Sequence, residues 1–66
     1  MKYTILKHKT KKGVYGYIHN DHLYKNLTPQ LFFNDCTEEC FRNQFSFAEC
    51  SLDEFEIVKV ELKEIK

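Results

Sequence analysis

Short runs of β-branched and aromatic residues at the start of the chain predict a β-hairpin. Residues 2–9 and 14–19 have this character, and between them lie four polar residues that end in Gly13. Glycine supplies the positive φ that a hairpin turn with a bulge requires. We therefore expect two antiparallel strands joined by residues 10–13, with Lys9 opposite Val14.

This pairing predicts which side chains share a face, because directly opposed residues point to the same side of a sheet. One face is predicted to be core and carries Tyr3, Ile5, Val14 and Ile18. The other is predicted to be amphipathic and carries Thr4, Leu6, His8, Tyr15, Tyr17 and His19. Exposed tyrosine, leucine and histidine together are typical of an interface. His8, Tyr15 and Tyr17 are therefore candidate partner-binding residues. We also expect self-association, as a homodimer formed across this face or by an edge strand that pairs with its copy, because it would enlarge the small core.

The middle of the chain predicts short elements. After the turn signal Asn20-Asp21, residues 22–24 are suited to a brief third strand. Thr28-Pro29 is typical of a helix N-cap followed by the first helical residue, which predicts one tight turn over residues 29–31. Residues 31–33 are either the end of that turn or a brief strand.

Apolar residues at helical spacing predict a helix over residues 36–48. Asp35 and Glu38 have the spacing of a capping box at its start. After a polar break at residues 51–54, charged residues alternate with Val58, Val60 and Leu62, which predicts a half-buried strand over residues 55–63. The fold class is thus α+β: a small antiparallel sheet, made of the N-terminal hairpin and the C-terminal strand, with one packed helix, in the order ββ(β)αβ.

The length of the chain restricts its function. We expect residues 1–66 to form a single small α+β domain, and a chain of this size buries only about 60% of the surface that it exposes when unfolded. Such a domain hardly accommodates the usual small-molecule cleft of ~300–1,000 Å³. No Ser-His-Asp spacing, phosphate loop or carboxylate pair is recognisable. We therefore expect neither enzymatic activity nor a cofactor.

Targeting signals and cysteines bear on the compartment. The N-terminal residues lack the apolar stretch of ~7–15 residues that a secretory signal needs, and no segment reaches the ~18 apolar residues that cross a bilayer. Three cysteines cannot all pair within one chain. We expect a reduced, cytoplasmic protein with no membrane contact.

The net charge of zero conceals an uneven distribution. Residues 1–26 carry +5 and residues 35–56 carry −6. One interpretation is structural, because glutamates favour a helix start and lysines protect a sheet edge. The functional interpretation is an acidic helix and loop surface that fits the basic groove of a partner protein. Its candidate contact residues are Glu38, Glu39 and Glu49.

Two alternatives use other residues. Lysines beside Tyr15 and Tyr17 could bind nucleic acid through phosphate contacts and stacking, although the zero net charge and the single arginine weaken this interpretation. The lysines are Lys7, Lys9, Lys11 and Lys12, next to His8. The second alternative is a zinc-linked structural homo-oligomer with the ligand set His19, His22, Cys36 and Cys40. Against it, the motif order is unusual and Cys40 lies on the apolar stripe, where free cysteine behaves as a small hydrophobe.

The sequence also resembles small uncharacterised phage-type ββαβ proteins of low-GC hosts. The similarity covers most of the chain through KYTILKHKTKKGVYGYI, the turn LTPQ, the capped helix and DEFEIVKVEL. The helix departs from that pattern, because Cys36, Cys40 and phenylalanines stand where alanine, leucine and lysine are expected. Several such phage proteins bind and block a host or defence enzyme, but the resemblance supplies no site residue. It implies a non-enzymatic inhibitor or modulator in the host cytoplasm.

Overall fold

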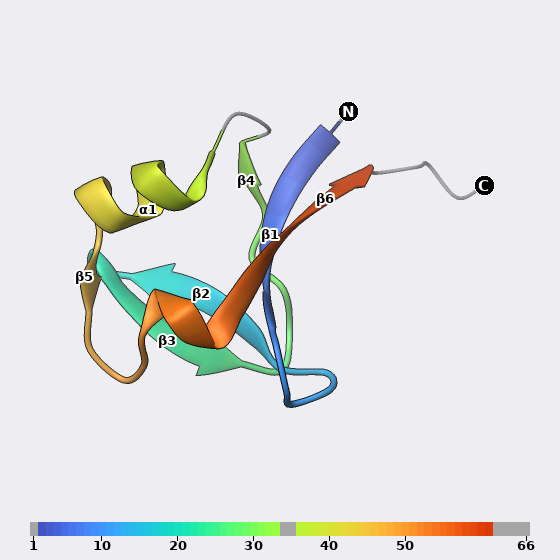
Figure 1. Cartoon of the computed structure of the whole chain (residues 1–66), viewed down its shortest axis with the longest axis horizontal. Coiled ribbons are helices and arrows are strands. Elements are labelled where there is room, and N and C mark those ends of the chain that lie inside the picture. The colour runs from blue at the N-terminus through green and yellow to red at the C-terminus, as the bar shows by residue number, and fades with distance from the viewer. Residues whose placement is uncertain (1, 34–35, 62–66) are drawn as a thin grey trace.

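Strand β1 (Lys2–His8) is central to the fold because it pairs with three other strands. The computed structural model describes residues 2–33 and 36–61. These residues form six strands in one mostly antiparallel sheet and a single α-helix, α1 (Glu38–Gln44), as Figure 1 shows. The predicted α+β fold class is confirmed.

Strand β6 (Phe55–Glu61) pairs with β1 along its whole length in antiparallel register. Its charged residues are exposed, and its apolar residues are buried or half-buried. The same alternation of charged and apolar residues predicted a strand from the sequence, and this strand is confirmed. The prediction continued to residue 63, and residues 62–66 lie outside the described part of the chain.

Strand β2 (Tyr15–His19) completes the predicted hairpin with β1, but the predicted register is wrong by one residue. Leu6 lies opposite Gly16 rather than opposite Tyr17. Gly16 favours this register because a Cβ at that position would lie only 3.0 Å from the Cβ of Leu6. A shift of one residue moves a strand's side chains to the other face of the sheet. Tyr15 and Tyr17 therefore do not share a face with Leu6.

Strand β3 (His22–Asn26) follows β2 through a two-residue turn. Asn20 and Asp21 have φ values of 50° and 63°. These are the φ signs of a type I′ turn, which asparagine and aspartate tolerate better than most residues. The third strand is confirmed and extends two residues beyond the predicted end at residue 24.

The segment after β3 contains no helical turn. Residues 27–31 have irregular structure, and strand β4 (Phe32–Phe33) pairs with Tyr3 and Thr4 of β1. The predicted turn at residues 29–31 is therefore wrong, and the brief strand is correct. The side chain of Gln30 contributes to this path, because its Oε1 accepts the backbone N–H of Ile18 in β2.

Helix α1 begins two residues later than predicted. Its N-cap is Thr37, whose Oγ1 accepts the backbone N–H of Cys40 at 3.3 Å. Threonine caps a helix by satisfying one of its unpaired N–H groups in this way. The predicted cap, Asp35, lies outside the described residues.

Helix α1 also ends earlier than predicted. Phe45 is extended, with φ −125° and ψ 144°, and strand β5 (Ser46–Phe47) pairs with β3 in parallel. The N–H of Ser46 donates to the carbonyl of Asp21 at 2.8 Å. The chain therefore returns to the sheet after seven helical residues, and the apolar spacing beyond Gln44 belongs to an extended segment.

The predicted polar break at residues 51–54 forms a capped 3-10 turn, η1 (Leu52–Glu54). The Oγ of Ser51 accepts the N–H of Asp53 at 3.3 Å, and Oε2 of Glu54 accepts the N–H of Ser51 at 2.9 Å. Together these bonds make a capping box. The turn buries Leu52 and leads directly into β6.

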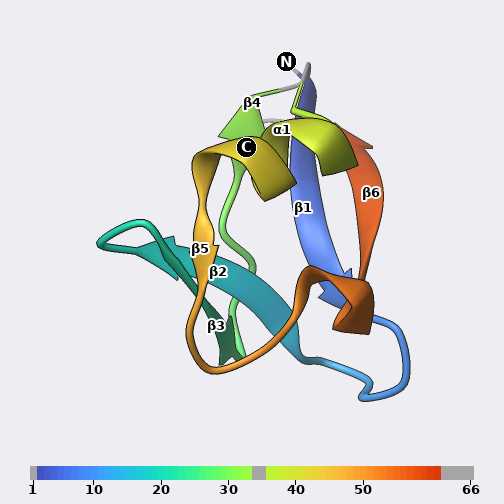
Figure 2. The ribbon, with the colours of Figure 1, turned by 60° about the vertical axis from the view of Figure 1, so that its left-hand side comes forward.

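The core lies between one face of the sheet and α1, which leads directly into β5, as Figure 2 shows. Phe41 of α1 is 1% exposed, and its ring meets that of Phe32 edge-on at 4.8 Å. From β1 the core takes Leu6, which the sequence placed on the amphipathic face. Ile18 packs against the core, as predicted. The buried cluster consists of Leu6, Leu23, Phe41, Cys50, Leu52 and Phe55.

Candidate binding surfaces

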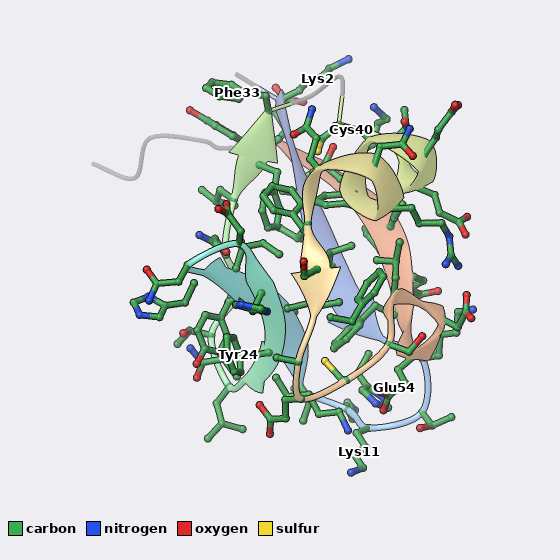
Figure 3. The ribbon with its side chains drawn as sticks, turned by 90° about the vertical axis from the view of Figure 1, so that its left-hand side faces the viewer. Lys2, Lys11, Tyr24, Phe33, Cys40 and Glu54 are labelled. Carbon is green, nitrogen blue, oxygen red and sulfur yellow. The ribbon has the colours of Figure 1, made fainter. Side chains whose placement is uncertain are left out.

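Three tyrosines gather on the face of β2 and β3 that points away from the core. The register places Tyr17 directly opposite Tyr24, with Tyr15 and His22 on the same face. The rings of Tyr17 and Tyr24 stack with centroids 5.5 Å apart, and His22 meets Tyr24 edge-on at 6.5 Å. All four side chains are half-buried, and Figure 3 shows Tyr24 on the side of β3 away from α1. These four residues are called the tyrosine face below.

Sequence reasoning identified Tyr15 and Tyr17 but missed Tyr24. The signal for Tyr24 was present in the Asn20-Asp21 dipeptide, because a two-residue turn at that point fixes Tyr17 opposite Tyr24. His19 also lies on this face, opposite His22, and is exposed.

His8 was predicted to share a face with Tyr15 and Tyr17. The observed register differs by one residue and places His8 on the opposite face of the sheet. Its side chain is buried, and its ring meets that of Phe55 edge-on at 5.3 Å. Nδ1 accepts the backbone N–H groups of Thr10 at 3.2 Å and Lys11 at 3.0 Å. A nitrogen with two such donors carries no hydrogen, so Nε2 carries it. His8 thus holds the β1–β2 turn, and Nε2 lies 3.5 Å from Oε1 of Glu54.

Glu54 joins the two oppositely charged regions of the sequence. Its carboxylate lies 2.8 Å from Nζ of Lys25 and accepts the N–H of Ser51. These bonds lower the pKa of Glu54 from 4.5 to about 2, and the bond with Lys25 has the largest effect. The same contact raises the pKa of Lys25. Part of the charge separation seen in the sequence is therefore neutralised within the fold.

The three candidate glutamates differ in their surroundings. Glu38 lies 3.0 Å from Arg42, which also contacts Asp53. The Oε2 atom of Glu49 accepts the backbone N–H of Lys25 at 3.3 Å. Glu39 is exposed and makes no ion pair within residues 2–33 and 36–61. Of the predicted acidic set, Glu39 therefore has the carboxylate that is best placed to meet a partner.

Positive charge gathers at the tip of the β1–β2 hairpin. Lys7, Lys9, Lys11 and Lys12 are exposed, and no ion pair involves them in the described part of the chain. Lys7 lies directly opposite Tyr15 and so shares its face of the sheet. Lys7 and the tyrosine face are thus neighbours, as the nucleic-acid alternative requires.

The residues considered as zinc ligands do not form one site. His19 and His22 flank the β2–β3 turn, whereas Cys36 and Cys40 lie at the start of α1. Among the described residues, no group of three or more His, Cys, Asp or Glu side chains could hold a metal ion. Cys36 and Cys40 nevertheless lie close together, with their Sγ atoms 3.6 Å apart, and both are half-exposed.

Cys50 differs from the other two cysteines. It is buried, and its thiol donates to the carbonyl of Leu23 at 3.7 Å. Burial raises the pKa of its thiol to about 11. Because the thiolate is the reactive form, this environment makes Cys50 a structural residue.

Apolar side chains are exposed around β4. Phe33 is 82% and Leu31 42% exposed. Together with Tyr3, Cys36 and Phe45 they line a hollow of about 390 Å³. We call this feature the apolar hollow. Its volume lies within the ~300–1,000 Å³ of small-molecule clefts, so the expectation that the chain is too short for one is wrong in volume. Exposed apolar groups in one place are typical of a contact surface.

Comparison of the chain with protein-family models, curated proteins and solved structures finds no match. No helix in the described part of the chain is long and apolar enough to cross a membrane.

Proposed function

We propose that the chain is a small binding module that performs no chemistry of its own and occupies a surface of a partner protein. The observation that carries this proposal is the stacked pair Tyr17–Tyr24 on the face away from the core. Tyrosines provide large, rigid and amphipathic contacts, and they are enriched at the centres of protein interfaces. The opposite face of the same strands already packs the core, so these rings are not needed there.

The acidic helix surface is the second part of the proposed contact. This surface consists of Glu38, Glu39 and Glu49. Glu39 is its most important residue for binding, because Glu38 and Glu49 also bond within the chain. A carboxylate at such a position speeds association with a basic surface and disfavours acidic partners.

The resemblance to phage-type ββαβ proteins supports a more specific form of the proposal. In that form the chain is a phage-encoded inhibitor or modulator, and its partner is a host or defence enzyme in the host cytoplasm.

Quantitative capture tests the proposal. The protein is immobilised, host lysate is passed over it, and the bound protein is identified and its amount measured. Replacing Tyr17 and Tyr24 by serine should lower the captured amount at least about tenfold, because hot-spot tyrosines each contribute more than 1 kcal/mol. Leu27→Ser is the matched control, since Leu27 is 76% exposed and lies after β3, outside the tyrosine face. Equal capture by the double variant, with an unchanged circular dichroism spectrum, would rule out the tyrosine face.

One observation favours nucleic acid as a second candidate partner. Lys7 and Tyr15 share a face, which pairs a phosphate contact with a stacking surface. Fluorescence titration with single-stranded and duplex oligonucleotides at two salt concentrations distinguishes the candidates. A chain that contacts phosphates loses affinity for both as salt rises. Absence of binding at low salt would leave the protein partner as the sole proposal.

A further inference from the structure

We infer that Cys36 and Cys40 are half of a tetrathiolate site for a thiophilic divalent ion such as Zn²⁺, and that a second copy of the chain supplies the other half. The two thiols are held by the backbone at the start of α1. The N–H of Cys36 donates to the carbonyl of Phe33 at 3.0 Å, and that of Cys40 donates to the Thr37 cap. These bonds fix the backbone of both residues, and the two Sγ atoms lie 3.6 Å apart, where each residue is half-exposed.

The separation of the two sulfur atoms matches two ligands on one ion. Sulfur atoms that each lie ~2.3 Å from a tetrahedral zinc ion are about 3.8 Å apart. The Sγ atoms of Cys36 and Cys40 are 3.6 Å apart. A disulfide requires about 2.05 Å, so the two atoms would have to approach each other by roughly 1.5 Å to form one. In the structure this separation is that of a hydrogen bond from the Cys36 thiol to the Cys40 sulfur, and it is also close to the separation of two sulfur ligands on one zinc ion.

The site needs ligands from elsewhere, because structural zinc is almost always four-coordinate. No third ligand adjoins the two cysteines among the residues that the structure describes. A second copy would provide two further thiolates, and a two-fold symmetric arrangement would use the same residues on both chains.

The surroundings of the two thiols favour a second copy. Cys36 lines the apolar hollow together with Leu31 and Phe33, and Phe33 is 82% exposed. Figure 3 shows Phe33 and Cys40 at the same end of the molecule. A contact that shares the ion would also bury these apolar side chains, which a domain with a small core needs.

The proposed step is ligand exchange without oxidation. Each of the four thiols loses a proton to solvent as its sulfur forms a bond to Zn²⁺. The ion releases water molecules in return, and the completed site carries a charge of −2. Metal binding to thiols is accordingly weaker at low pH.

Titration of the reduced chain with Co²⁺ and with Zn²⁺ tests the inference. Co²⁺ should give the thiolate charge-transfer and tetrahedral d–d absorption bands, with saturation at one ion for every two chains. Zn²⁺ should displace Co²⁺, double the molar mass measured by light scattering, and raise the melting temperature by several degrees in proportion to binding. Cys36→Ser or Cys40→Ser should abolish all of these changes. Cys50→Ser is the matched control and should retain the absorption bands and their stoichiometry.

Three outcomes would overturn the inference. One is the absence of thiolate absorption with Co²⁺. Another is saturation at one ion per chain without a change in mass, which would leave no role for a second copy. The third is metal binding that survives both serine variants. Phe33→Ser tests the apolar contact separately and should weaken the metal-linked dimer at least about threefold, because truncation of an aromatic ring at a contact lowers affinity.

Discussion

At the residue scale, two buried ring nitrogens of the first three strands, Nε2 of His8 and Nδ1 of His22, have no hydrogen-bond partner among the described residues. His8 accepts two N–H groups of the β1–β2 turn through one ring nitrogen and faces Glu54 with the other. Glu54 in turn binds Lys25 and caps η1. The carboxylate of Glu54 therefore connects the hairpin, strand β3 and the start of β6. Its protonation should weaken its contacts with all three.

The lowered pKa of Glu54 predicts a loss of stability in acid. The folded chain keeps this carboxylate charged down to about pH 2, whereas the unfolded chain protonates it near its ordinary pKa of 4.5. Between these values the unfolded state binds more protons, so the contribution is complete above about pH 4.5 and is lost as the pH falls to about 2. Thermal melts followed by circular dichroism from pH 6 to 2 measure this.

Glu54→Gln should have a melting temperature that depends less on pH within this range. Glu61→Gln is the control, because Glu61 is an exposed glutamate at the end of β6. Parallel profiles for the wild type and Glu54→Gln would contradict the role of the carboxylate.

At the element scale, the sequence predicted the strands well but not how they pair. Hydrophobic alternation and turn residues located the hairpin, β3 and β6 to within a few residues. The register of β1 and β2 depends on a tertiary contact, the close approach of Gly16 to Leu6. The alternation of apolar and polar residues along each strand gives no information about this contact. A shift of one residue then exchanged the faces, which is why His8 was grouped with the tyrosines.

Helix α1 shows a second limit of pattern reasoning. Apolar spacing over residues 36–48 fits a helix, and Phe41 does face the core. The same spacing does not reveal that the Ser46 N–H bonds to Asp21 or that β5 joins β3. Pairing with a distant strand replaces the last helical turn, as tertiary context often overrides local propensity. The i, i+4 spacing of Cys36 and Cys40 indicated that they lie close together, although Cys36 precedes the N-cap Thr37 and is not itself helical.

Gly16→Ala tests the origin of the register. The added Cβ would lie 3.0 Å from Leu6 Cβ and 3.3 Å from Cδ1 of Leu23 in the packed core. We expect a loss of about 1–3 kcal/mol in the free energy of unfolding, measured by urea denaturation, because overpacking a core costs this much. Gly13→Asn is the control: Gly13 has φ +79° with open space around it, and asparagine tolerates that region. Unchanged stability of Gly16→Ala would show that the close approach does not set the register.

At the scale of the whole molecule, folding redistributes the charge that the sequence separates. The acidic residues 35–56 meet Arg42 from their own region and Lys25 from the basic one. The lysines of the hairpin tip and Glu39 make no such ion pairs among the described residues. The neutral chain therefore presents a basic hairpin tip, and its acidic helix surface is weaker than the sequence suggests. Substitution of Glu39 is the best test of that acidic surface.

Glu39→Lys should reduce partner capture with only a small loss of stability. The residue is exposed and has no ion pair to lose within the described chain, so the only expected loss is the charge effect at the first turn of α1, at most about 1 kcal/mol in circular dichroism melts. Glu38→Lys would also break the pair with Arg42, an exposed contact that contributes at most about 1 kcal/mol. Reversal of both should therefore leave the fold intact and abolish capture from lysate.

The electrostatic origin of that effect is tested by salt and by a matched variant. Glu61→Lys makes the same change in net charge on β6, far along the chain from α1, and should retain capture. Raising the salt concentration should narrow the difference between wild type and Glu39→Lys, because exposed charges more than about 8–10 Å apart are screened at physiological ionic strength. If Glu39→Lys and Glu61→Lys behave alike, only the total charge matters, and the acidic surface of α1 has no specific role in binding.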